Sequence, residues 1–359
     1  MLLTPPNPTP PTHPDYLPAA VIREPAPSAR RAALAELAAR LTVRDRWLLH
    51  ALREHQVLTG PQIARIAFDG PRIANRRLKI LAEELRVIDR FRPLRAIGSA
   101  PEHYVLGPYG AQVLAAEAGV TIKELGYHRN RALAIAHSPR LNHQVGVNEV
   151  YSHLAAASRT AGGSRTRQDA ENDVAKEALV SWWSELTCFH LYGDLARPDA
   201  FGRWQAPGTG GGVRTAEFFL EYDTGTENLD RLLAKLDGYA RLAAVTAIDT
   251  PVLFWLQSPL RERALHRLLA LNPPAVPVAT ATPTACEGTT PAGPVWELAA
   301  RRTARRLHLA ELAAYTAGGG HRAAERDADA VRTGRLFDPP APLPPDSERP
   351  AQGRERRDG

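Results

Sequence analysis

The sequence predicts an α/β protein (α+β overall) with two domains, a basic helical domain followed by a larger domain built on a β-sheet. Two patterns support this fold class. Between residues 32 and 120 the apolar spacing and turn signals read helix, helix, helix, hairpin, helix. From residue 142 the pattern changes to helix, three strands, helix and strand. A length of 359 residues is sufficient for two cores of this kind.

Helix caps and periodicity define the first helices. Thr42 and Asp45 form a Thr-x-x-Asp capping box before an apolar helix. Pro61 falls in the first turn of a short helix, 62–67. A longer helix, 71–85, follows, with four residues spaced to face a core, namely Ala74, Leu78, Leu81 and Leu85.

A hairpin and a last helix complete the first domain. Residues 87–94 and 103–106 are predicted strands, and helix 108–118 ends at Gly119. This order is typical of a winged helix-turn-helix, predicted over residues 28–125. In that fold the second helix of the turn enters the DNA major groove and the wing contacts the backbone.

The charge distribution agrees with a polyanionic partner. Residues 28–130 carry 17 basic and 10 acidic side chains, which indicates nucleic acid. Arginine and asparagine suit guanine and adenine edges, and arginines on a wing suit phosphates. The residues expected to contact double-stranded DNA are Arg72, Asn75, Arg76, Lys79, Arg90, Arg92 and Arg95. A solvated polar face, or a winged helix that contacts protein, remains the alternative.

A linker at 126–136 leads to the second domain, predicted over residues 137–316. Its expected elements are a helix at 142–157, strands at 187–192, 197–204 and 215–222, a helix at 228–244, and a strand at 251–256. Later segments add helices, including 260–271 and 299–315, and one or two strands. The tails, 1–27 and 317–359, are rich in proline and charge, so we expect them to be mostly disordered.

Acidic residues in the second domain recur at strand ends. Asp199 follows Pro198, and Glu221 and Asp223 end an apolar run. Lys235 and Tyr239 lie one turn apart on the next helix. Carboxylates that converge at one end of a sheet would hold a hard cation such as Mg²⁺ through oxygen ligands, and a lysine beside them would orient a phosphate or its attacking water. The alternative is that these acids only mark turns and strand ends.

Other features exclude several classes of protein. There is no apolar run long enough to cross a membrane and no secretory signal. The two cysteines, Cys188 and Cys286, lack metal-ligand spacing, which indicates a reducing cytoplasm and no zinc site. The glycine-rich turn 208–212 lacks the ending of a phosphate-binding loop, so no nucleotide cofactor is expected.

The second domain resembles the restriction-endonuclease-like, or PD-(D/E)XK, core. The resemblance implies that Asp199 and Glu221 bind Mg²⁺ or Mn²⁺, helped by Glu149 or Asp223. Asp223 stands where the pattern has a lysine. Some branches move that polar residue to the next helix, and the segment from Lys235 to Tyr239 looks like such a version. The implied catalytic residues are Asp199, Glu221, Lys235 and Tyr239.

The whole chain resembles the replication-relaxation family of actinobacterial plasmids and integrative elements. The resemblance covers roughly residues 40–315 and depends on three strings, Arg197-Pro198-Asp199, the run 218–227, and 235–239. It implies a role in replication or DNA relaxation of a mobile element, with replication or transfer proteins of that element as further partners. A metal-dependent DNA endonuclease or nickase is one outcome. The alternative is a non-catalytic DNA-binding replication accessory or a transcriptional regulator.

Overall fold

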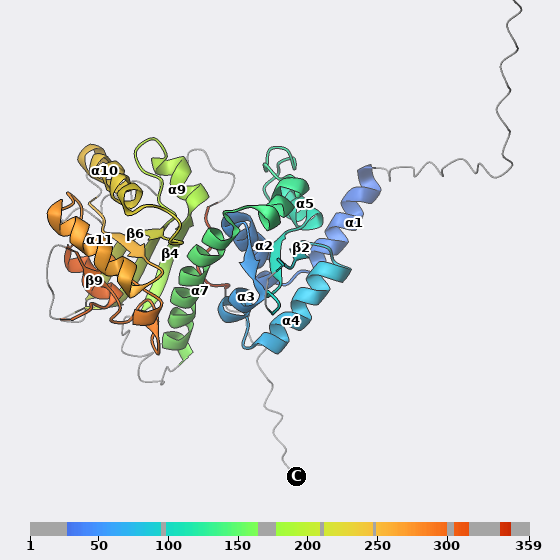
Figure 1. The fold of residues 1–359 in the computed structure, drawn as a ribbon. Helices are drawn as coiled ribbons and strands as arrows, with labels where there is room; N and C mark the ends of the chain where they lie inside the picture. Colours follow the sequence, from blue (N-terminus) through green and yellow to red (C-terminus); the bar gives the residue numbers. More distant parts are fainter. Residues whose placement is uncertain are drawn as a thin grey trace, which may run out of the picture. The chain divides into compact units, whose positions relative to one another are not determined.

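A computed structural model describes residues 27–94, 98–163, 177–208, 212–246, 249–299, 305–315 and 338–345. The residues up to Arg40 form one compact unit and residues 41–359 form a second. In the first unit the described residues contain helix α1 (Pro27–Ala39). The second unit holds a mixed six-stranded sheet and its covering helices, so the prediction of an α/β fold is confirmed (Figure 1). None of the described helices combines the length and apolar character needed to cross a bilayer.

The part before residue 138 is mainly helical. Its elements are α2 (Val43–His55), β1 (Leu58–Thr59), α3 (Gly60–Ala67), α4 (Pro71–Lys79), the π-helix η1 (Ile80–Glu84), β2 (Ile88–Phe91), β3 (His103–Leu106), α5 (Pro108–Glu117), α6 (Arg129–Ala134) and the 3₁₀-helix η2 (Ile135–His137). The three strands form an antiparallel sheet in the order β1-β3-β2.

Local signals explain where these helices begin. The capping box of Thr42 and Asp45 is present at the start of α2, as predicted. A second capping box, Thr59 with Gln62, begins α3. The first hairpin strand is shorter than the predicted 87–94, because β2 ends at Phe91, two residues before a proline that has no N–H to donate.

The predicted linker at 126–136 is largely helical. It contains α6 and η2. Leu133 and Ile135 of this segment pack against a small core that includes Val57, Val105 and Leu141. The segment is therefore held by burial of apolar side chains that the sequence pattern did not reveal.

The second part is built on the large sheet. Its elements are α7 (Leu141–Gly163), β4 (Ala178–Ser184), α9 (Glu185–Tyr192), β5 (Ala200–Pro207), β6 (Val213–Tyr222), α10 (Leu229–Thr246), β7 (Val252–Trp255), α11 (Pro259–Leu271), β8 (Val278–Ala281), the 3₁₀-helix η4 (Thr284–Cys286), β9 (Glu297–Leu298) and the 3₁₀-helix η5 (Leu309–Tyr315). The strand order is β4-β5-β6-β7-β8-β9. Strands β4 to β6 are antiparallel, whereas β6, β7 and β8 are parallel and are joined through α10 and α11.

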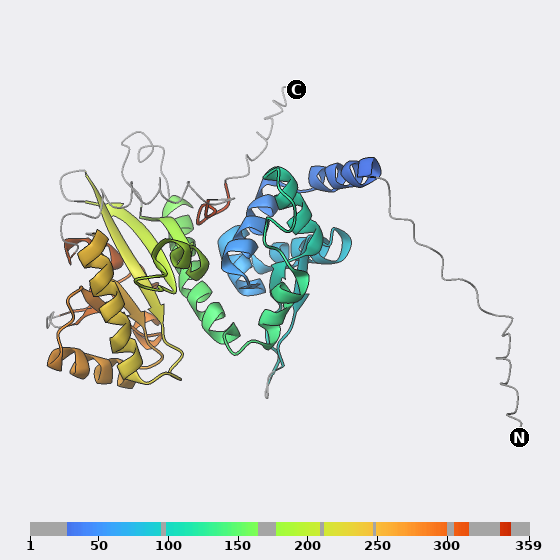
Figure 2. The same ribbon diagram turned by 90° about the horizontal axis from the view of Figure 1, so that it is seen from above.

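Helices cover both faces of this sheet. Figure 2 shows α7, in green, on one side of the yellow strands, and α10 and α11, in yellow-orange and orange, on the other. Alternate residues of each strand supply the two cores. Trp182 and Phe218 pack toward Tyr151 of α7, and Phe201 and Phe219 belong to the core under α9, α10 and α11.

Two predicted elements of the second part are wrong. The expected strand 187–192 is helix α9, and the true strand, β4, lies before it. Ser184 caps α9 by accepting a hydrogen bond from the Thr187 N–H, and the buried Glu54 carboxylate accepts from Ser184 and Thr187. The expected helix 299–315 is, in its described residues, the short 3₁₀-helix η5 with extended chain before it.

Polar side chains of α7 join the helical part to the sheet part. Asn148 donates to the backbone carbonyls of His55 (3.3 Å) and Val57 (2.6 Å), and its own carbonyl accepts from His55 Nδ1 (3.0 Å). Arg159 donates to the carbonyls of Arg65 and Phe68, each at 2.9 Å. All these groups would be costly to bury without partners, so each bond stabilises this junction.

A proline-rich segment from the C-terminal region also contacts the junction. The structure describes residues 338–345 of the predicted 317–359 tail, and we call this segment the strap. The Trp47 indole donates to the Ala341 carbonyl (2.7 Å), and the Tyr151 hydroxyl donates to the Pro342 carbonyl (2.7 Å). Because Trp47 is on α2 and Tyr151 on α7, the strap connects the two helices.

Candidate functional site

Strands β5 and β6 place two buried carboxylates opposite each other. Ala200 pairs with Leu220, so the preceding Asp199 lies across from Glu221 on the same face of the sheet. The backbone bond from the Asp199 N–H to the Leu220 carbonyl (3.1 Å) holds this register. Both carboxylates are buried. We call Asp199 and Glu221 the acidic pair.

Helix α10 brings two donors to one member of the pair. Lys235 Nζ donates to Glu221 Oε2 (2.6 Å), and the Tyr239 hydroxyl donates to Oε1 (2.5 Å). Residues four apart lie on the same helix face, so one turn of α10 reaches both oxygens. The structure thus brings together Asp199, Glu221, Lys235 and Tyr239, while their chemical roles stay predictions.

Asp199 is held by a different helix. His143 of α7 donates from Nε2 to Asp199 Oδ2 (2.9 Å), and the Tyr222 N–H donates to the same oxygen (2.7 Å). Asp199 Oδ1 accepts no hydrogen bond from the described part of the chain. His143 is not among the residues that the sequence predicted for the site. No spacing signal marks it, because its partner is 56 residues away.

A glycine lets α7 approach the strand that carries Glu221. A Cβ on Gly146 would lie 2.2 Å from the Tyr222 ring, far inside contact distance. The His143 and Tyr222 rings meet edge to face with centroids 5.9 Å apart. The close crossing at Gly146 is therefore what places His143 within reach of Asp199.

The environment of the acidic pair disfavours two negative charges. Burial and then the charge of Asp199 raise the pKa of Glu221 to about 7, although Lys235 and Tyr239 oppose the shift. Burial opposes the charge of Lys235, but Glu221 and Asp199 outweigh it and raise the pKa of the amine. Burial likewise opposes protonation of His143, and its bond to Asp199 outweighs it and raises its pKa.

The raised pKa of Glu221 makes the stability of the chain depend on pH. The folded state holds this proton more tightly than the unfolded state, so the contribution is complete below the ordinary carboxyl pKa and is lost as the pH rises through about 7. We expect wild type in EDTA to lose stability between about pH 5 and about pH 8, and Glu221→Gln to lose less.

Urea unfolding at a series of pH values measures this difference. The raised pKa of His143 also makes stability fall as the pH rises, but His143 is present in both proteins, so the difference between them isolates Glu221. Equal pH slopes for the two proteins would contradict the assignment.

Two of the predicted metal ligands have other partners. Asp223 is buried and forms a bidentate pair with Arg261, whose Nη2 lies 2.9 Å from Oδ1 and whose Nε contacts Oδ2. Glu149 of α7 accepts from Gln62 (2.9 Å) and pairs with Arg65 (2.9 Å). Burial opposes ionisation of Glu149, but hydrogen bonds from His153 and Gln62 and the charge of Arg65 lower its pKa to about 2.

The remaining pair still suits a divalent cation. Mg²⁺ keeps several waters and binds proteins through one or two carboxylates, and Asp199 Oδ1 is free of protein donors among the described residues. The described ranges also contain another candidate metal site. Its ligand atoms, from Glu262, His266 and Glu297, lie within 4.8 Å of one another. There Arg306 already forms an ion pair with each glutamate, at 2.6 Å from Glu262 and 3.1 Å from Glu297.

The side chains predicted to contact DNA gather in two places. Four lie exposed on α4, and we call them the α4 face, namely Arg72, Asn75, Arg76 and Lys79. On the hairpin Arg90 pairs with Glu83 (2.7 Å) and Arg92 with Glu102 (2.8 Å). Arg95 lies outside the described residues.

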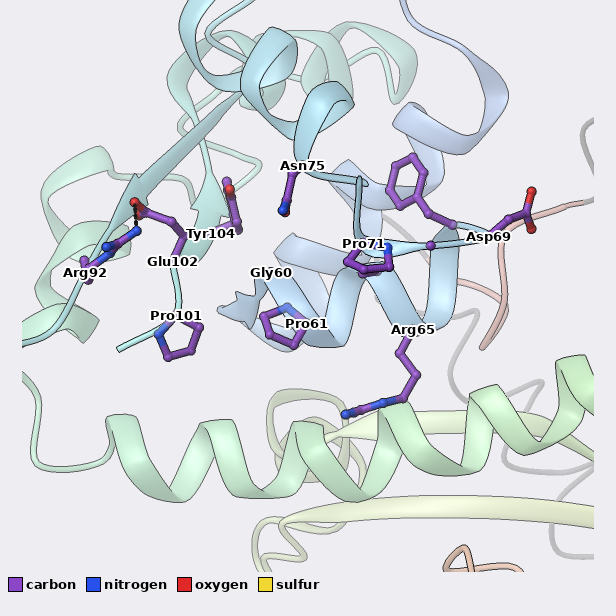
Figure 3. A pocket seen from close by; sticks show the side chains of 13 residues that line it. Gly60, Pro61, Arg65, Asp69, Pro71, Asn75, Arg92, Pro101, Glu102 and Tyr104 are labelled. Carbon is purple, nitrogen blue, oxygen red and sulfur yellow. Dashed lines mark hydrogen bonds and ion pairs between the residues drawn. The ribbon is translucent and has the colours of Figure 1, made fainter. Parts of the chain in front are cut away.

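The α4 face borders a hollow of about 630 Å³ between the start of α4, helix α3 and the hairpin. In Figure 3 Asn75 points from α4 into this hollow, and Arg92 and Glu102 lie together at its edge. The inner side of α4 is anchored, because Arg77 forms a bidentate pair with the buried Asp45, with Nε 3.0 Å from Oδ1. The helix therefore presents its other basic residues outward.

Comparison with known proteins identifies the family. No curated protein and no solved structure matches the chain. A family model described as replication-relaxation matches residues 49–253, more than half of the chain. The matched span runs from α2 into β7 and includes both the α4 face and the acidic pair. The chain therefore belongs to the replication-relaxation family.

Proposed function

We propose that this replication-relaxation protein, whose family suggests a role in plasmid replication or relaxation, binds double-stranded DNA and cleaves it with Mg²⁺ or Mn²⁺ at the acidic pair. One observation carries the proposal. Two opposed, buried carboxylates share their face of the sheet with a lysine that reaches Glu221 at 2.6 Å. A buried set of charges is costly to fold, and a buried carboxyl with a raised pKa, such as that of Glu221, is characteristic of functional sites.

The order of elements supports the same reading. Helix α7, strands β4 to β6, helix α10 and strand β7 follow the helix, three-strand, helix, strand order of the PD-(D/E)XK core, with helix α9 inserted between β4 and β5. The acidic pair falls where that core has its metal ligands, and Lys235 stands on the helix that carries the displaced polar residue in some branches. The activity itself is argued from the side chains rather than from the fold.

Each residue of the cluster has a role in this proposal. Asp199 Oδ1 and the Glu221 carboxylate would hold the cation, which would supply a Lewis acid and an activated water. His143 fixes Asp199 by occupying its other oxygen. Tyr239 fixes the Glu221 carboxylate through its hydroxyl, and Lys235, which donates to the same carboxylate, would contact a phosphate oxygen of the substrate.

DNA docks through the helical part. The order of α2, α3, α4, hairpin and α5 fits a winged helix, with α4 as the helix that enters the major groove. Arg72 and Arg76 are exposed and form no ion pair within the described residues. The hairpin arginines form exposed pairs with Glu83 and Glu102, which are weak enough for phosphates to compete.

Arg76→Ala tests the docking face. We expect weaker binding to duplex DNA, and a slope of log affinity against log salt reduced by about 1, because one phosphate contact is lost. The matched control is Arg305→Ala, which removes the same charge from an ion pair with Glu311. Fluorescence anisotropy at several salt concentrations measures both. If the two changes reduce DNA affinity equally, DNA does not bind at the α4 face.

Nicking of supercoiled plasmid in Mg²⁺, Mn²⁺ or EDTA tests catalysis. The proposal expects metal-dependent conversion to the open circle. A second function, a non-catalytic replication accessory, is favoured by one observation, since both Glu221 oxygens already accept from protein donors. If the wild-type protein binds plasmid but does not nick it with either metal ion, the accessory function is correct.

A further inference from the structure

A cavity lies at the start of α7 and has no role in the proposed function. It has a volume of about 700 Å³, within the range of small-ligand sites. Its walls come from the end of α2, from the segment around α6, from the first turn of α7 and from α9. We call it the α7 cavity.

Charge and apolar surface are separated in this cavity. Its apolar wall includes Leu52, Leu106, Leu125, Ile135 and Leu186. Its ionic residues are Arg53, Arg131, Arg140 and Glu185. Arg140 and Glu185 pair with each other (2.5 Å), and the lining as a whole contains three arginines and one glutamate. An apolar wall with a cationic rim complements a base attached to a phosphate.

One turn of α7 links the cavity to the acidic pair. Arg140 and Gln144 line the cavity, and His143, between them in sequence, binds Asp199 at 2.9 Å. Gln144 is buried, and its side-chain carbonyl accepts no hydrogen bond from the described residues. The amide nitrogen of Gln144 donates to Asn148 (3.5 Å), so the carbonyl oxygen is the part of this side chain that a ligand group could bind.

A strained turn faces the same cavity. Gln56, which lines it, has φ 64° and ψ −44°, a backbone conformation that non-glycine residues rarely adopt. The bond from the Val57 N–H to the His55 carbonyl (2.7 Å) closes a γ-turn of the strained kind. Asn148 clamps both flanking carbonyls. Strain that the fold maintains in this way is typical of binding sites.

We propose that the α7 cavity binds one unpaired nucleotide of the DNA strand beside the phosphate held at the acidic pair. This inference rests on the proposed function and deepens it by naming the substrate class, DNA with an unpaired or extruded nucleotide. The base packs on the apolar wall and offers its edge to the carboxamides of Gln56 and Gln144. Arg131 and Arg140 hold the flanking phosphates.

The test measures binding in EDTA, so that cleavage plays no part. The probe is a short single-stranded oligonucleotide with one 2-aminopurine, whose fluorescence falls when the base packs against protein. Wild type is expected to quench it. Arg131→Ala is expected to weaken binding about tenfold, because a charge-assisted contact is lost. Ala134→Trp, at an exposed lining position, is expected to block the cavity and abolish quenching.

Arg129→Ala is the matched control. It lies on the same helix, pairs with Asp89 and does not line the cavity, so its affinity should equal that of wild type. Unchanged quenching in Arg131→Ala and Ala134→Trp would overturn the inference, even if plasmid is nicked. If the wild-type protein does not bind the oligonucleotide, the inference is also overturned, and a protein partner becomes the alternative occupant of the cavity. If both variants reduce the quenching but the wild-type protein does not nick plasmid, the nucleotide site in the cavity is supported and the catalytic proposal is rejected.

Discussion

Glu221→Gln is expected to reduce metal-dependent nicking on the order of 10³-fold, equivalent to about 4 kcal/mol of transition-state stabilisation. The amide has nearly the shape of the carboxylate, so Tyr239 can still donate to its oxygen. It has no charge, however, and the acidic pair then holds a cation with one carboxylate instead of two. Affinity for duplex DNA should stay within about twofold, because the α4 face is untouched.

A control on the same strand separates chemistry from folding. Glu217 is also buried, lies on the same face of β6 and pairs with Arg203 at 2.8 Å. Glu217→Gln makes the same chemical change outside the cluster and should nick plasmid like wild type. Initial nicking rates over a range of Mg²⁺ concentrations, with binding measured in parallel, provide the comparison. If Glu221→Gln nicks as fast as wild type, the acidic pair is not the catalytic site.

Asp223→Ala is expected to lower the free energy of unfolding by about 3 kcal/mol, the lower end of the range for breaking a buried ion pair. Asp223 accepts twice from Arg261 and once from the Gly225 N–H (3.0 Å). Its removal leaves the guanidinium partly buried, with the Glu227 carbonyl as its one remaining acceptor among the described residues. That guanidinium side chain is 19% exposed, and water therefore relieves part of the cost.

The measurement is urea unfolding of Asp223→Ala, Arg261→Ala and the double variant. Because each single change leaves one buried partner alone, the double variant should be less destabilised than the sum of the two. Additive losses would show that the pair is not coupled. The same proteins test the metal hypothesis for Asp223, since a structural residue should leave the Mg²⁺ dependence of nicking unchanged.

The sequence predicted which parts of the candidate site would lie together, and the reason is local geometry. Lys235 and Tyr239 share a helix face by their spacing alone. Asp199 and Glu221 end up opposed because β5 and β6 form an antiparallel pair, which follows from two neighbouring strands and a short turn. The α/β class and most of the helices followed from periodicity and caps in the same way.

Partners distant in sequence could not be predicted. Asp223 was grouped with the metal ligands because it stands two residues from Glu221, yet its partner Arg261 comes 38 residues later. Glu149 is paired with side chains of α3, more than 80 residues before it. Residues 187–192 read as a strand from their composition, and the helix is selected by Ser184 and by Glu54 of α2. In each case tertiary packing decides among conformations that local sequence permits.

The strap has a consequence for the order in which the protein matures during synthesis. Residues 338–345 leave the ribosome after every helix and strand from α2 to η5, and domains fold in the order of their synthesis. Until then Trp47 and Tyr151 lack the carbonyls to which they donate. The strap can therefore connect α2 and α7 only after Pro342 has been synthesised. Until that point the nascent chain contains the helical part and the sheet part without this connection.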